Sequence, residues 1–117
     1  MRAPRVLHWA AAAAALFMIA GLLRLGETEL AVGLVPSPWD KLVHAATFGA
    51  MAFLVWLGSG QRWLVMCATA VFALACYDEW RQQMLPGREA DLLDLSANAV
   101  GIVLAALIAR RLSPPEI

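Results

Sequence analysis

The sequence predicts an all-α membrane protein, a compact bundle of four transmembrane helices with both termini on the cytoplasmic side. Three observations predict this fold: the apolar composition, four long apolar segments and the placement of the basic residues. The chain has 117 residues, 62% of them hydrophobic, and its mean hydropathy is +0.68. A soluble domain averages about 45–50% apolar residues, and one this short could not hide the excess from water. We therefore expect a single domain, residues 1–117, with the bilayer as its solvent.

The four apolar segments cover about residues 6–23, 42–57, 63–83 and 92–109. A hydrocarbon core about 30 Å thick needs roughly 20 helical residues, and the uninterrupted apolar parts of the second and third segments are shorter. Their helices must therefore continue into Asp40-Lys41 and into Asp78–Arg81, which brings ionisable groups to the membrane boundary. In the first segment the small residues precede the most apolar stretch, so we expect an uncleaved span and not a signal peptide.

The basic residues predict the orientation. With four spans, both termini and the Gly58–Arg62 turn share one side, and that side carries Arg2, Arg5, Arg62, Arg110 and Arg111. The opposite side is mainly acidic. Because Lys and Arg near short connections favour the cytoplasmic side, an N-in/C-in arrangement is expected.

The tryptophans agree with this arrangement, because aromatic residues collect at both membrane boundaries. Trp39 and Trp80 are expected at the outer boundary, and Trp9, Trp56 and Trp63 near the inner one.

Polar side chains recur one helical turn apart at the outer ends of three spans. The pairs are Asp40 and His44 in the second span, Asp78 and Gln82 with Glu79 and Gln83 in the third, and Asp94 and Asn98 in the fourth. Residues with i,i+4 spacing share a helix face. Polar groups within an apolar segment should face the bundle interior, since lipid offers them no partner. We therefore expect the three stripes to meet at one depth beneath the outer boundary.

The order and spacing of these residues resemble the VanZ-like family over residues 40–101. The matching motifs read Asp40-Lys41-Leu42-Val43-His44, Asp78-Glu79-Trp80-Arg81-Gln82, Pro86-Gly87-Arg88, and Asp94-Leu95-Ser96-Ala97-Asn98 followed by Gly101. The resemblance implies a small multi-pass protein of the bacterial cytoplasmic membrane. The family's namesake is associated with low-level resistance to teicoplanin, a lipid-bearing glycopeptide, so the resemblance implies a role in the cell envelope without implying a reaction.

The residues expected to bind a ligand combine cations with carboxylates and amides. They are Asp40, Lys41, His44, Glu79, Gln82, Arg88, Asp94 and Asn98. Lys41 and Arg88 would receive an anion, Arg88 in a bidentate manner. A polar pocket open to the outer leaflet suits a lipid head group, a lipid-linked cell-wall precursor or a lipoglycopeptide. Nucleic acid is not an expected partner, because the chain has no basic stripe.

Other readings of the same residues remain open. One is a membrane enzyme, a hydrolase or transferase acting on a lipid-linked head group, with His44 as base, Glu79 as acid and Arg88 nearby; however, the chain has no Gly-x-Ser-x-Gly or His-Glu-x-x-His motif. Another is a small proton-coupled transporter, although the first span has no deep ionisable residue. The third is a fixed ion-pair network that ties helix ends together, with Asp78 and Asp91 as solvated boundary charges.

Neither a cofactor nor a metal site is predicted. The few His and acidic residues lack metal-ligand spacing in the sequence, although Asp40, His44, Glu79 and Asp94 could form a mixed site if the fold brought them together. No oligomeric state is predicted.

Overall fold

The computed structural model describes residues 2–26, 39–84 and 92–113, and these residues form four α-helices. A short described turn connects the second helix to the third. The helices are α1 (Arg5–Gly26), α2 (Trp39–Gly58), α3 (Leu64–Gln82) and α4 (Leu92–Leu112). The expected continuation of the short apolar segments is confirmed, because α2 begins at Trp39 and α3 continues to Gln82.

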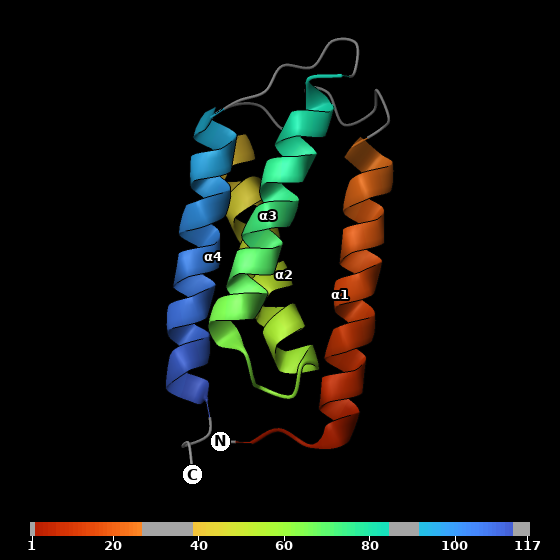
Figure 1. Ribbon diagram of the computed structural model, residues 1–117, viewed down its shortest axis with the longest axis vertical. Helices are drawn as coiled ribbons and strands as arrows, with labels where there is room; N and C mark the ends of the chain where they lie inside the picture. The colour runs from red at the N-terminus through yellow and green to blue at the C-terminus, as the bar shows by residue number, and fades with distance from the viewer. Residues whose placement is uncertain (1, 27–38, 85–91, 114–117) are drawn as a thin grey trace.

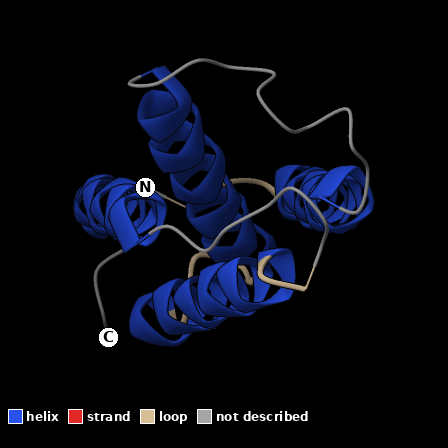
Figure 2. Ribbon diagram, turned by 90° about the horizontal axis from the view of Figure 1, so that it is seen from above, coloured by secondary structure: helices blue, strands red, loops and turns tan. Residues whose placement is uncertain are grey.

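The helices lie side by side along one long axis (Figure 1). α2 and α4 run in one direction while α1 and α3 run in the other, so α1 begins and α4 ends at the same end of the bundle. Viewed along the axis in Figure 2, the four helices surround a common interior. α2 has its most extensive contact with α4 and its next with α1, whereas α1 and α3 scarcely touch.

Three glycines allow the closest helix approaches, two of them between α2 and α4. A Cβ added at Gly101 would collide with the backbone carbonyl oxygen of Ala45, and one added at Gly49 would lie 2.8 Å from the Gly101 oxygen. A Cβ at Gly58 would lie 2.9 Å from the Ala12 backbone. Small residues permit such crossings between membrane helices, where van der Waals packing replaces the hydrophobic effect. The α2–α4 crossing therefore depends on the absence of two methyl groups.

The core is a row of apolar side chains from α2, α3 and α4. Its buried members are Phe48, Met51, Ala52, Val71, Ala75, Ile102 and Ala105. A second buried cluster at the opposite end contains Trp56, Cys67 and Ala109. Trp56 is only 1% exposed, so its expected place in an aromatic belt is wrong; it continues the spacing of Phe48 and Ala52 along the core face of α2. Trp9, Trp39, Trp63 and Trp80 are all exposed.

Large apolar side chains cover the outside of the bundle, as expected for a protein surrounded by lipid. Phe17 is 81% exposed and Val65 is 79% exposed. α1, α2 and α4 each contain a segment long and apolar enough to cross a membrane, with mean hydropathies of 2.0, 1.4 and 2.1. The protein is thus a multi-pass membrane protein. α3 is not among these three candidate spans, because Asp78, Glu79 and Arg81 occupy its last two turns.

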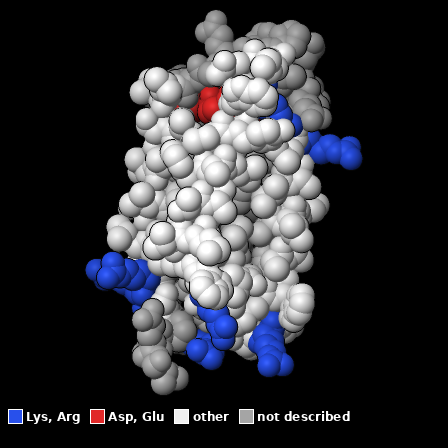
Figure 3. Space-filling view, viewed as in Figure 1, with Lys and Arg blue, Asp and Glu red and all other residues white. Residues whose placement is uncertain are grey.

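Charge is distributed unequally between the two ends of the bundle. In Figure 3 the acidic atoms visible on this face lie near the end where α2 and α4 begin, while several basic side chains project from the opposite end. Arg5, Arg62, Arg110 and Arg111 are exposed there. The beginning of α1, the end of α4 and the α2–α3 turn lie together at this basic end, as the sequence predicted.

Candidate functional site

The side chain of Lys41 joins α2 to α4 at the acidic end of the bundle. Its Nζ donates to Asp94 Oδ1 at 2.6 Å and to Asp40 Oδ2 at 3.0 Å. The side chains of Lys41, Asp94 and Asp40 are 24%, 14% and 26% exposed. A pair that is only partly covered is less screened than one in water and can still be reached by a solute. The sequence predicted that Lys41 binds an anion. In the structure two carboxylates already contact its ammonium group, so an incoming anion must share the ammonium with them.

His44 and Asn98 extend this cluster one turn deeper. His44 Nε2 lies 3.6 Å from Asp94 Oδ2. Asn98 is 1% exposed, and with its amide oriented to match its neighbours, its nitrogen donates to His44 Nδ1 and to the His44 carbonyl at 3.2 Å. An acceptor role for Nδ1 puts the proton of the neutral ring on Nε2, facing Asp94. The two helices are therefore joined by one continuous polar cluster: Asp40, Lys41, His44, Asp94 and Asn98, here called the α2–α4 polar cluster.

A second polar group occupies the end of α3. Asp78 is 2% exposed, Glu79 6% and Gln82 9%. Gln82 Nε2 donates to Asp78 Oδ2 at 3.0 Å, which uses the i,i+4 spacing seen in the sequence. The expected inward-facing stripe of Asp78 and Gln82 is confirmed, and the alternative reading of Asp78 as a solvated boundary charge is wrong, because α3 turns this residue towards the bundle interior.

Arg81 fixes the end of α3 against α1. Its Nη2 donates to the Leu23 carbonyl at 2.9 Å and lies 3.5 Å from Asp78 Oδ1. The guanidinium also lies 5.9 Å from the centre of the Tyr77 ring, within the range of a cation–π contact. Sequence reasoning did not assign Arg81 a role, although its i,i+3 position relative to Asp78 was a usable signal.

The structure thus brings together the site residues predicted on α2 and α4, and it buries Glu79 and Gln82 at the same end of the bundle on α3. Arg88, the second predicted anion receiver, and Asp91 lie outside the described residues. Within residues 2–26, 39–84 and 92–113 no group of three or more His, Cys, Asp or Glu side chains could hold a metal ion.

Gln61 forms a third polar contact point, at the basic end, that sequence reasoning missed. Its Oε1 accepts from the Ala3 backbone N–H at 2.6 Å and lies 3.4 Å from His8 Nε2. Its Nε2 donates to the Leu112 carbonyl at 3.4 Å. Gln61 has a φ of 61°, a region that non-glycine residues seldom occupy. The turn between α2 and α3 therefore holds the beginning of α1 and the end of α4, and His8 has the structural role of a hydrogen-bond partner.

The family model described as VanZ/LLP1 matches residues 6–113. The chain belongs to the VanZ/LLP1 family. The VanZ/LLP1 match extends from the first turn of α1 to the end of α4, well beyond the motifs between residues 40 and 101. No curated protein and no solved structure matches the chain.

Proposed function

We propose that this VanZ/LLP1 protein binds the polar head group of an amphiphile at the outer boundary of the bacterial cytoplasmic membrane. The observation that carries the proposal is the Lys41–Asp94 contact of 2.6 Å between α2 and α4, largely but not fully covered, at the end of two membrane-spanning helices. Charged groups within spanning helices are costly and usually functional. The ligand class is a lipid head group, a lipid-linked cell-wall precursor or a lipoglycopeptide such as teicoplanin.

The chemistry of the α2–α4 polar cluster limits which head groups would fit it. Lys41 supplies one cation, whereas Asp40 and Asp94 supply acceptors. Within the described part of the chain, Asp40 Oδ1 is covered and has no hydrogen-bond partner. A head group that carries a phosphate or carboxylate together with amine or hydroxyl donors would satisfy both kinds of group. Phospholipids with an amine, glycosylated lipids and lipoglycopeptides share this chemistry.

The N-in/C-in orientation is part of the proposal. The exposed Arg5, Arg62, Arg110 and Arg111 lie at the end opposite to the α2–α4 polar cluster, which supports a cytoplasmic basic end. α3 would then be the fourth span, with its charged end shielded by the bundle. A reporter fusion in the turn at Gly60 tests this: a cytoplasmic signal supports the orientation, and an external one overturns it.

The enzyme alternative receives less support from the geometry. A general base needs a free lone pair near the proton it removes, and in His44 the Nδ1 lone pair accepts from Asn98 while Nε2 faces Asp94. This arrangement orients the ring as a structural donor and acceptor. The described part of α1 has no ionisable residue between His8 and Arg24, which weighs against the proton-coupled transporter.

Binding is tested with the full chain in phosphatidylcholine nanodiscs and three probes: phosphatidylethanolamine, an undecaprenyl-linked wall precursor and teicoplanin. We expect one of them to bind saturably, and Lys41→Ala and Asp94→Asn to weaken that binding severalfold. Arg62→Ala is the matched control, because it removes an exposed cation from the opposite end. Binding that Lys41→Ala and Asp94→Asn leave unchanged, in protein that remains folded, would overturn the proposal and favour a fixed ion-pair network.

A further inference from the structure

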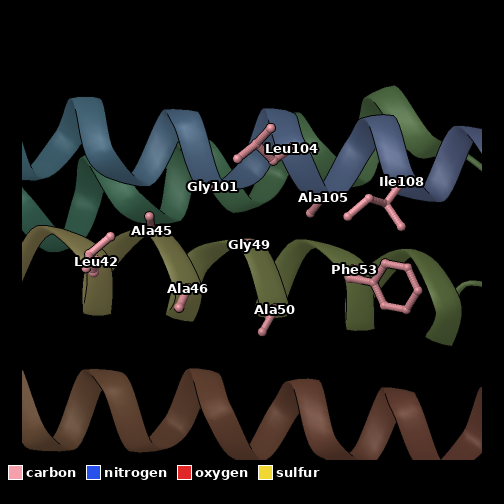
Figure 4. A pocket seen from close by; sticks show the side chains of 10 residues that line it. All are labelled: Leu42, Ala45, Ala46, Gly49, Ala50, Phe53, Gly101, Leu104, Ala105 and Ile108. Atoms are coloured by element: carbon pink, nitrogen blue, oxygen red, sulfur yellow. The ribbon is translucent and has the colours of Figure 1, made fainter.

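An apolar groove of about 540 Å³ lies between α2 and α4. Figure 4 shows its α2 wall, formed by Leu42, Ala45, Ala46, Gly49, Ala50 and Phe53, opposite the segment of α4 from Gly101 to Ile108. Leu42 is 61% exposed and Ile108 is 56% exposed, so the groove opens sideways from the bundle. Since both walls are membrane-spanning helices, the surroundings of this opening are lipid hydrocarbon.

The length of the groove along α2 is close to the thickness of the hydrocarbon layer of one leaflet. From Leu42 to Phe53 the α2 wall rises about 16 Å at 1.5 Å per residue. The hydrocarbon core of a bilayer is about 30 Å thick, so one leaflet accounts for about half of it. A groove of this length accommodates the chain of a single outer-leaflet molecule, whereas a helix from a second copy would pack along most of the bundle.

The groove begins where the α2–α4 polar cluster ends. Lys41, Ala45 and Gly49 follow one another at i,i+4 spacing on the face of α2 towards α4, and Asp94, Asn98 and Gly101 follow on the facing side of α4. The 2.6 Å ion pair of Lys41 with Asp94 therefore crosses between the same two helices that form the walls below it. A charged cluster next to one end of an apolar groove matches the division of an amphiphile into a polar head group and a hydrocarbon chain.

We propose that the groove holds one hydrocarbon chain of the amphiphile whose head group contacts the α2–α4 polar cluster. The inference rests on the proposed function and adds the place of the chain, which makes the protein a receptor for the whole amphiphile in the plane of the membrane. Ligand entry is lateral, from the outer leaflet, through the open side between Leu42 and Ile108.

The test uses phosphatidylethanolamine with a photoreactive group midway along one chain, reconstituted with the full chain in phosphatidylcholine nanodiscs. Ala46→Phe places a ring in the groove from an exposed position of α2. The matched control is Ala73→Phe, an exposed alanine of α3 that does not line the groove. We expect the wild type and Ala73→Phe to be labelled at groove residues of α2 and α4, competed by unlabelled phosphatidylethanolamine, and Ala46→Phe to lose this labelling severalfold.

Three outcomes would overturn the inference: equal labelling of all helices, groove labelling that survives Ala46→Phe, and a dimer in native mass spectra that Ala46→Phe abolishes, since a second copy would then be the occupant.

Lys41→Ala separates the two proposals. Unchanged groove labelling in Lys41→Ala would count against head-group binding and leave the chain in its groove. If phosphatidylethanolamine binds saturably and in a Lys41-dependent manner but does not label the groove, the proposed site for the hydrocarbon chain is wrong and the head-group proposal stands.

Discussion

The ammonium of Lys41 and the carboxylate of Asp94 lie 2.6 Å apart, although 53 residues separate them along the chain. Their contact joins two helices that run in the same direction, at the level where apolar side chains give way to charge. Removing one partner of a covered ion pair leaves the other charge without compensation, which costs more than the pair itself contributes.

The ion pair predicts a non-additive double-mutant cycle. Lys41→Ala and Asp94→Ala should each lower the free energy of unfolding by about 1–3 kcal/mol, the cost of leaving a covered polar group unsatisfied. The double variant should be less destabilised than the sum, because neither partner of the Lys41–Asp94 pair then remains without the other; the loss of the Asp40 contact is common to both variants that lack Lys41. Unfolding in mixed micelles with increasing denaturing detergent measures the three values, and strict additivity would show that the two side chains do not interact.

Gly101→Ala should destabilise the bundle strongly. Its new methyl group would collide with the backbone carbonyl of Ala45, which cannot rotate away, and overpacking of this kind costs about 1–3 kcal/mol or more. Gly21→Ala is the matched control, because a Cβ there meets nothing within 4 Å and alanine favours the helix by about 0.8–1 kcal/mol over glycine. Thermal unfolding in detergent compares the two variants, and equal melting temperatures would contradict the close crossing of α2 and α4.

Gln61→Ala should loosen the beginning of α1 and the end of α4, at the basic end of the bundle, without changing ligand binding. It removes the acceptor for the Ala3 N–H and the donor to the Leu112 carbonyl, at a cost of about 1–2 kcal/mol for the groups left unpaired. Hydrogen exchange should rise in the first turn of α1 and the last turn of α4. Arg62→Ala, an exposed neighbour in the same turn, should leave exchange unchanged; a rise limited to the turn itself would contradict the proposed bridging.

Arg81→Ala should release α1 from α3 at the acidic end. The Arg81 guanidinium donates to the Leu23 carbonyl, and hydrogen bonds from charged donors contribute about 1.5–3 kcal/mol. We expect faster proteolysis near the end of α1 in the variant. Arg24→Ala changes an exposed arginine in the last turn of α1 and serves as the control. Identical cleavage rates in the two variants would contradict a role of Arg81 in holding the end of α1 against α3.

Periodicity and length were sufficient to predict the four helices and the convergence of Asp40, His44, Asp94 and Asn98. Apolar segments too short for a bilayer forced the charged ends of α2 and α3 into helices, and i,i+4 spacing then put the polar groups of α2 and α4 on facing sides. Local pattern sufficed here because each stripe lies within one helix.

The remaining features depend on contacts that no local pattern records. Gln61 binds backbone groups near both ends of the chain, and backbone partners leave no signature in the sequence. Trp56 was assigned to the membrane boundary from its residue type, whereas its spacing from Phe48 and Ala52 favoured the core. For Asp78 the sequence left two readings open, an inward-facing stripe with Gln82 and a solvated boundary charge, and the rotation of α3 about its axis decides for the first.

Gly101 lies seven residues below Asp94 on α4, about 10 Å along the helix axis. Because α2 and α4 touch through bare backbone at that level, the separation of the two helices there also sets how far apart Lys41 and Asp94 stand above it. A single methyl group gained at Gly49 or Gly101 during evolution would spread the two helices without altering any residue of the α2–α4 polar cluster. Under the proposed function, selectivity among amphiphiles would then change through the spacing of the two helices, while the charged motif stays the same.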